Sequence, residues 1–327
     1  MNGQSRSSGE ALTVADHAES GAIVMTLGGD KDTYVLQGED YLEAGCHAVD
    51  TVTVNISDSV QISGDVDTSK TGDYLVTYTA ENAAGERQSV ERTVHVVDSF
   101  DETATTIPVL MYHYVYDADN PPSDVNSNYL PDTAFEAQLQ YLSENDYYYP
   151  SYEELRGFVE GTHSLPAKSV ILTFDDGERG FLDYGVPLLN EYEVPATSFV
   201  ICNDDDVYEK LTDYASPYVS FQSHTYSMHR DGSTEGQGGV IHSLSEDEIY
   251  EDVVTAQEIL GATEALAYPY GDNNETAWAA LDRAGVLCAF TVENRRIEPG
   301  DNPYALPRSR IFGDIAQAGF EWLVRPE

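Results

Sequence analysis

Two adjacent carboxylates, Asp175 and Asp176, end a run of β-branched and apolar residues, 170–174, and are followed by Gly177. Side chains of an extended strand point alternately to opposite faces, so both carboxylates reach one cavity only if the backbone turns, which Gly177 permits. Neighbouring carboxylates repel each other unless a cation or a shared proton separates their roles. The carboxyl end of a strand is where α/β proteins build active sites. Because an ordinary Asp-Asp-Gly turn explains the same residues, the pair needs partners before it indicates a site.

Two histidines, His224 and His229, are the candidate partners, since they follow the apolar run 218–221. A spacing of five does not place two side chains on one face of a helix, which requires three or four. The spacing favours a strand end that enters a first helical turn, where both imidazoles converge on one ion. One aspartate and two histidines are a common ligand set for a divalent transition metal that keeps positions open for water and substrate.

Three motifs, at 173–177, 223–229 and 268–271, occur in this order and resemble those of the NodB-homology polysaccharide deacetylases. The resemblance covers the chain from about residue 107 onwards, and no GxSxG, HExxH, P-loop or GxGxxG pattern competes with it. It implies an α/β domain whose sheet curls into a distorted, incomplete (β/α) barrel. The implied activity is metal-dependent hydrolysis of N-acetyl groups on N-acetylglucosamine-containing polysaccharide, such as peptidoglycan, chitin-type chains or poly-N-acetylglucosamine.

The family motifs imply a role for each motif residue. The implied metal ligands are Asp176, His224 and His229. The expected ion is zinc, with cobalt, nickel and iron as alternatives. Asp175 stays outside the coordination sphere and takes the proton from the attacking water. The turn at Pro269 and Tyr270 brings the backbone N–H of Tyr270 to the oxyanion.

The general acid departs from the commonest family pattern. Many members carry it on a late Leu-x-x-His motif, but no histidine follows His242 in this chain. Some members that act on poly-N-acetylglucosamine carry the histidine on the first strand instead, and Met-Tyr-His at 111–113 resembles that arrangement. His113 is therefore the expected acid, and the alternative is a histidine that only packs at a strand end.

The arginine that usually precedes the Pro-aromatic turn is also missing, because Tyr268 occupies its position. We expect Arg308 or Arg310, at the end of the last strand, to take over its role. That role is to orient Asp175 through a charge-assisted hydrogen bond.

The rest of the chain divides into four stretches. Residues 1–20 are expected to be a disordered tail or linker, and 99–106 a polar linker. Between them, 21–98 shows short alternating strands and turns, which predicts an immunoglobulin-like β-sandwich. Its run at 72–85 resembles bacterial immunoglobulin-like repeats of surface proteins. From 107 to 327, strands alternate with helical patterns, and repeated βα units imply a parallel sheet.

Composition limits the partners and the location of the protein. The chain has 327 residues, with 58 acidic against 16 basic side chains and a net charge of −42, which argues against nucleic-acid binding. No run is long enough for a transmembrane helix. The first ten residues lack the apolar core of a signal segment, so the protein is either cytoplasmic or has lost a leader. We expect the second, hence an extracellular or wall-associated monomer that binds an acetylated glycan.

Three other functions stay open at the level of sequence. An O-acetyl esterase acting on acetyl-xylan would use the same residues. A non-catalytic glycan-binding or adhesion protein would rest on the immunoglobulin-like part, although the intact Asp and His motifs favour an enzyme. A metal-dependent amidohydrolase acting on a small amide is the third.

Overall fold

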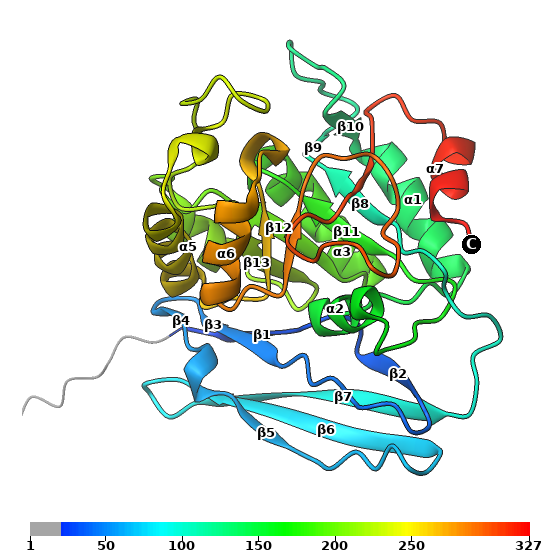
Figure 1. Ribbon diagram of the computed structural model, residues 1–327. Coiled ribbons are helices and arrows are strands. Elements are labelled where there is room, and N and C mark those ends of the chain that lie inside the picture. Colours follow the sequence, from blue (N-terminus) through cyan, green and yellow to red (C-terminus); the bar gives the residue numbers. More distant parts are fainter. Residues whose placement is uncertain (1–20) are drawn as a thin grey trace, which may run out of the picture.

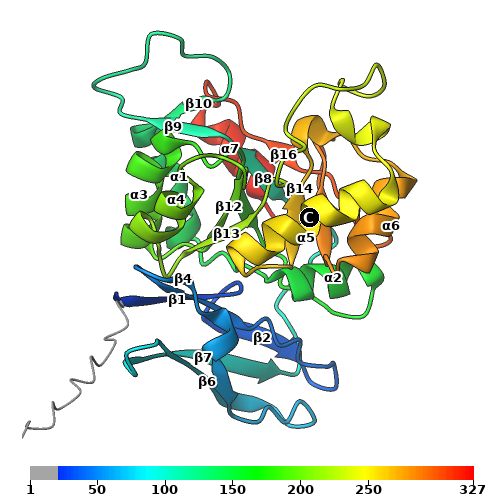
Figure 2. The ribbon, with the colours of Figure 1, turned by 90° about the vertical axis from the view of Figure 1, so that its left-hand side faces the viewer.

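The computed structural model describes residues 21–327, so the predicted tail at 1–20 lies outside the described residues. An all-β part lies below a larger α/β part (Figure 1), and the view turned by 90° shows the same two layers (Figure 2). Among the described residues, no helix is both long enough and apolar enough to cross a bilayer.

The N-terminal part consists of two sheets, with strand orders β1-β3-β4 and β2-β7-β6-β5. Its elements are β1 Ile23–Leu27, β2 Asp32–Leu36, β3 Cys46–Asp50, β4 Val54–Asn55, the 3-10 helix η1 Ser57–Ser59, β5 Gln61–Ser63, β6 Gly72–Glu81 and β7 Arg87–Val97. Alternate residues of β6, including Val76 and Tyr78, are buried, as the predicted alternation requires. The predicted all-β class of this part is confirmed. The alternating run at 51–56 predicts a strand, but only Val54–Asn55 forms one, because residues 51–53 are a turn that ends at Val54 with φ +68°.

Seven parallel strands form the curled sheet of the second part, in the order β15-β14-β13-β12-β11-β8-β16. They are β8 Val109–Tyr112, β11 Ile171–Phe174, β12 Ala196–Val200, β13 Val219–Ser223, β14 Ala265–Ala267, β15 Cys288–Phe290 and β16 Ser309–Arg310. A separate parallel pair, β9 Tyr114–Tyr116 and β10 Tyr129–Pro131, carries the projecting loop 117–128. The predicted incomplete (β/α) barrel is thereby confirmed.

Helices cover the outside of this sheet (Figure 2). The helical elements of this part are α1 Asp132–Glu144, α2 Tyr152–Glu160, the π-helix η2 Phe181–Gly185, α3 Val186–Tyr192, α4 Val207–Asp213, η3 Val240–Ser243, α5 Glu246–Leu260, η4 Pro269–Gly271, α6 Glu275–Arg283 and α7 Gln317–Val324. Capping boxes begin α2 at Ser151 and α5 at Ser245, because each serine exchanges hydrogen bonds with the glutamate three residues later.

The segment 303–310 lies between the two edges of the sheet. Leu306 bridges to Phe290 at the end of β15, and Ser309 pairs with Leu110 of β8. Since one short segment contacts both edges, a side chain at 308 can enter the interior of the barrel.

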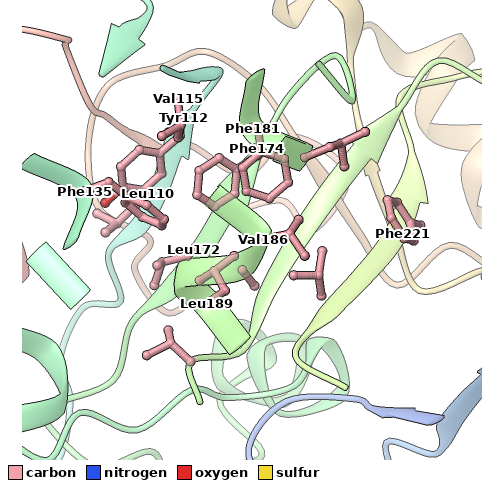
Figure 3. Packing of buried hydrophobic residues seen from close by; sticks show 14 of the residues in the cluster. Leu110, Tyr112, Val115, Phe135, Leu172, Phe174, Phe181, Val186, Leu189 and Phe221 are labelled. Carbon is pink, nitrogen blue, oxygen red and sulfur yellow. The ribbon is translucent and has the colours of Figure 1, made fainter. Parts of the chain in front are cut away.

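Packed aromatic rings fix the end of β11, as Figure 3 shows. The ring of Phe174 stacks on Phe181 at 3.9 Å and on Tyr112 at 4.7 Å between centroids, and meets Phe135 edge-on at 5.5 Å. Close-packed cores resist displacement of their side chains. The residue directly before Asp175 is therefore held firmly, and so is the start of the turn that follows.

The β-sandwich packs against the amino ends of the barrel strands. The hydroxyl of Thr26 donates to the carbonyl of Ser216 at 2.6 Å, and His47 lies 3.3 Å from the carboxylate of Glu264. Both contacts lie before the start of a barrel strand, at the end of the sheet opposite its carboxyl edge. The sandwich is thus docked on the far side of the barrel from the carboxylate pair.

Two carboxyl groups at this contact link stability to pH. Burial, helped by the charge of Glu264, raises the pKa of Glu153 to about 7. Burial also raises the pKa of Asp30 to about 6. A carboxyl with a raised folded-state pKa contributes its full stability below the unfolded pKa, which is near 4. This contribution is lost as the pH rises through the folded-state pKa.

The Glu153→Gln variant is accordingly expected to lose less stability than the wild type when the pH rises from about 5 to about 8. Urea unfolding midpoints across this range measure the effect, and the exposed Glu91→Gln serves as the control with a wild-type slope. Parallel slopes for wild type and Glu153→Gln would show that burial of this carboxyl does not limit stability.

Candidate active site

Asp175 lies directly after β11 and is 4% exposed. Its carboxylate accepts two hydrogen bonds from the guanidinium of Arg308, both at 2.7 Å. Burial by itself would raise the pKa of Asp175, but the charge and hydrogen bonds of Arg308 lower it below its usual value. The structure therefore presents Asp175 as an ionised carboxylate in a fixed orientation.

Asp176 turns away from its neighbour because the backbone changes direction here. Asp176 has φ +72° and Gly177 has φ +59°, both in the left-handed region. A side chain at Gly177 would bring its Cβ within 2.6 Å of the Val200 side chain, so glycine is required for close packing as well as for the turn. The expected turn is present, and the two carboxylates are separated by it.

The histidines meet Asp176 at one point. Its Oδ1 lies 3.3 Å from Nε2 of His224 and 3.4 Å from Nε2 of His229. The candidate ligand atoms of the three residues all lie within 4.8 Å of one another. The expected helical turn after β13 is wrong, because 224–229 forms bends and irregular backbone, with Thr225 at φ +72°.

The residues present fit a divalent transition metal. Nδ1 of His224 lies 2.8 Å from the carbonyl of Ala267, which can only accept, so this nitrogen carries the proton and Nε2 offers its lone pair. A ligand histidine held by a backbone carbonyl is the usual arrangement around protein-bound metals. Burial opposes ionisation of Asp176, but the two imidazoles lower its pKa. A negatively charged carboxylate oxygen and two imidazole nitrogens thus surround the position that a divalent ion would occupy.

The two candidate arginines have different surroundings. Arg308 is fully buried, and besides Asp175 it donates to the carbonyl of Thr291 at 3.1 Å and to the hydroxyl of Thr173 at 3.1 Å. Arg310 instead donates to the side chain of Asn128 at 2.6 Å, in the projecting loop. The structure brings Arg308 to Asp175 and does not bring Arg310 there.

His113 and Tyr270 complete the predicted set. His113 separates β8 from β9, and burial lowers its pKa while the carboxylates of Asp175 and Asp176 oppose that effect. The ring of Tyr270 lies 5.0 Å from that of His229, and Tyr270 has φ +62° after the buried Pro269. Both residues therefore lie at the carboxyl edge, close to the proposed ligands.

Sequence reasoning missed Asp252, which holds the histidine segment in place. Its carboxylate accepts hydrogen bonds from the backbone N–H groups of Tyr226 and Ser227, both at 2.8 Å. The sequence could have indicated this role, because Asp252 lies on the apolar stripe of α5 that also carries Ile249 and Val253. A carboxylate on an otherwise apolar stripe needs buried partners.

Sequence reasoning also missed Tyr114, the residue after His113. Its hydroxyl donates to Oδ2 of Asp176 at 3.1 Å. Burial and the charge of Asp176 raise the pKa of Tyr114, so the phenol stays protonated and donates. The sequence did not indicate this contact, because tyrosines are frequent in the chain and nothing distinguishes Tyr114 from the others.

Two family models match the chain in the regions that the fold separates. Residues 25–96 match the bacterial surface protein Ig-like domain, and residues 162–289 match polysaccharide deacetylase. The second range contains Asp175, Asp176, both histidines and the Pro269-Tyr270 turn.

Individual proteins are similar over the second part. The poly-β-1,6-N-acetyl-D-glucosamine N-deacetylase of Staphylococcus epidermidis is 26% identical over 218 residues, which is 62% of this chain and 73% of that protein. The deacetylase PplD of Streptococcus pyogenes, solved in complex with acetate, is 26% identical with a TM-score of 0.57, over 68% of this chain and 100% of that chain. IcaB from Ammonifex degensii is 25% identical with a TM-score of 0.55, over 67% of this chain and 96% of that chain. The chain therefore carries a bacterial surface Ig-like domain, matched at residues 25–96, before a polysaccharide deacetylase domain, matched at residues 162–289.

Proposed function

We propose that the protein is a metal-dependent deacetylase that removes N-acetyl groups from a polysaccharide containing N-acetylglucosamine, and that it works outside the cell. One observation carries the proposal. A triad with the donor set of a metal site, Asp176 with two histidines, adjoins a second carboxylate, Asp175, that a buried arginine holds apart. Hydrolysis of an acetamide needs both parts, because the amide is a poor electrophile with a poor leaving group.

The proposed ligands are Asp176, His224 and His229. A divalent ion held there would lower the pKa of a bound water and polarise the acetyl carbonyl. Asp175 accepts the proton of the attacking water, whose oxygen bonds to the carbonyl carbon. The N–H of Tyr270 supports the oxyanion, in the role that the family's Pro-aromatic turn implies. The C–N bond then breaks as His113 gives a proton to the nitrogen, which yields acetate and a free amine.

The surroundings of the site support a sugar substrate. A hollow of about 400 Å³ lies beside Asp176 and His229 and is also lined by Tyr114. This volume is within the usual range for a small-molecule pocket. The relatives named above include an N-deacetylase of poly-β-1,6-N-acetyl-D-glucosamine, and a surface Ig-like domain suits a protein that works on an external glycan. Poly-N-acetylglucosamine is therefore the first substrate to test, before chitin-type chains and peptidoglycan.

Removal of divalent metal is expected to abolish acetate release, and addition of zinc to the stripped protein is expected to restore it. Mass spectrometry of acetylated oligosaccharides measures the loss of one acetyl mass for each reaction, with mock-treated protein as the control. Release from acetyl-xylan alone would assign an O-acetyl esterase, and release from small amides alone would assign an amidohydrolase. Binding of glycan without acetate release at any metal would overturn the proposed activity.

A further inference from the structure

The carboxylate of Asp176 has two oxygens with different surroundings. Oδ1 faces the Nε2 atoms of both histidines, at 3.3 and 3.4 Å. Oδ2 accepts the hydroxyl proton of Tyr114 at 3.1 Å, and no other hydrogen bond to this oxygen is present among residues 21–327. One oxygen is thus directed at the candidate ion, and the other is occupied by a phenol.

The phenol that makes this contact is itself fixed. Tyr114 pairs in register with Tyr129 across β9 and β10, and their rings lie 4.5 Å apart. Strand β9 also packs tightly on the turn before η2, since a side chain at Gly180 would meet the carbonyl of Val115 at 2.5 Å. The hydroxyl of Tyr114 is therefore held by the strand pair that carries the projecting loop, outside the motifs that supply the ligands.

We propose that Tyr114 is a positioning residue that fixes Asp176 for coordination through Oδ1 alone; the inference rests on the metal centre proposed above. A carboxylate on a flexible torsion can bind an ion through one or both oxygens. The hydrogen bond to Oδ2 restrains that torsion and directs the lone pairs of Oδ1 towards the histidines. Partners that hold a ligand in this way strengthen metal binding, and their loss typically weakens it about 10- to 100-fold.

The test compares zinc affinity of Tyr114→Phe, Tyr116→Phe and wild type, with metal-stripped protein competing against a chromophoric chelator. Both variants keep an aromatic ring on β9, but only Tyr114 bonds to Asp176, so Tyr116→Phe is the matched control. We expect zinc binding at least tenfold weaker for Tyr114→Phe and unchanged for Tyr116→Phe. The visible spectrum of bound Co²⁺ reports ligand geometry directly and is expected to change only in Tyr114→Phe.

Equal zinc affinity and an identical Co²⁺ spectrum for Tyr114→Phe and wild type would overturn the role of Tyr114 and leave the metal centre standing. Failure of the wild type itself to bind zinc or cobalt would overturn the metal centre, and with it this role. Circular dichroism confirms that each variant is folded, and removal of a single hydroxyl from a partly exposed ring is expected to leave it unchanged.

Discussion

Asp175→Asn is expected to release acetate about 10²- to 10⁴-fold more slowly than wild type while binding the same amount of metal. The amide has nearly the shape of the carboxylate, but it cannot take the proton from the attacking water. Metal content is expected to persist because the proposed ligands are Asp176, His224 and His229, and the turn at Asp176 separates its carboxylate from that of Asp175. Single-turnover acetate release and metal analysis of the same preparation provide the two measurements.

Two other aspartate variants provide the comparisons for this result. Asp176→Asn removes a proposed ligand and is expected to lose metal and activity together, since a neutral amide is a poor ligand for the ion. Asp213→Asn, at the exposed end of α4, is expected to retain both. If Asp175→Asn kept more than about a tenth of the wild-type rate, which general-base loss does not allow, another group would have to accept the proton.

The family of the second part could be predicted from sequence because its motifs are local. Each proposed ligand lies one to six residues after a strand, and the carboxyl ends of neighbouring parallel strands meet at one edge of a sheet. Once β11 and β13 are placed in the sheet, the positions of Asp176 and His224 at its carboxyl edge follow. A strand ending and a glycine were sufficient to predict the turn between the carboxylates.

The choice between Arg308 and Arg310 could not be made in this way. Residues two apart on a strand point to the same side, so alternation treats the two arginines alike. The decision comes from tertiary structure, because 303–310 lies between the two edges of the sheet. At 308 the side chain enters the closed interior, whereas Arg310 pairs with Met111 near the rim and reaches the projecting loop.

The bounds of β1 could not be predicted from the sequence, for a related reason. In β1, the consecutive residues Met25, Thr26 and Leu27 are all buried, since one face meets the sandwich core and the other meets the barrel. A strand covered on both faces loses the alternation of apolar and polar residues. The contact between the two parts therefore removed the pattern that would have revealed the strand.

The largest expected effect on folding comes from Arg308→Met, which should lower the free energy of unfolding by about 3–5 kcal/mol. The guanidinium is fully buried and neutralises Asp175, which is itself 4% exposed. Its removal leaves a buried carboxylate without a partner, and two threonine oxygens lose a donor. Urea unfolding of the metal-stripped protein measures the loss without a contribution from the ion.

A double variant separates the charge from the packing. Adding Asp175→Asn to Arg308→Met removes the unpaired buried carboxylate, so the double variant is expected to be more stable than Arg308→Met alone. Arg310→Met is the matched control and is expected to lose less stability, because this arginine lies near the rim and bonds to the neutral Asn128, a contact worth about 1.5–3 kcal/mol. Equal stabilities for the two single arginine variants would mean that the pair at the barrel centre is not what holds Asp175 in place. A double variant no more stable than Arg308→Met would instead assign the loss to packing rather than to the unpaired charge.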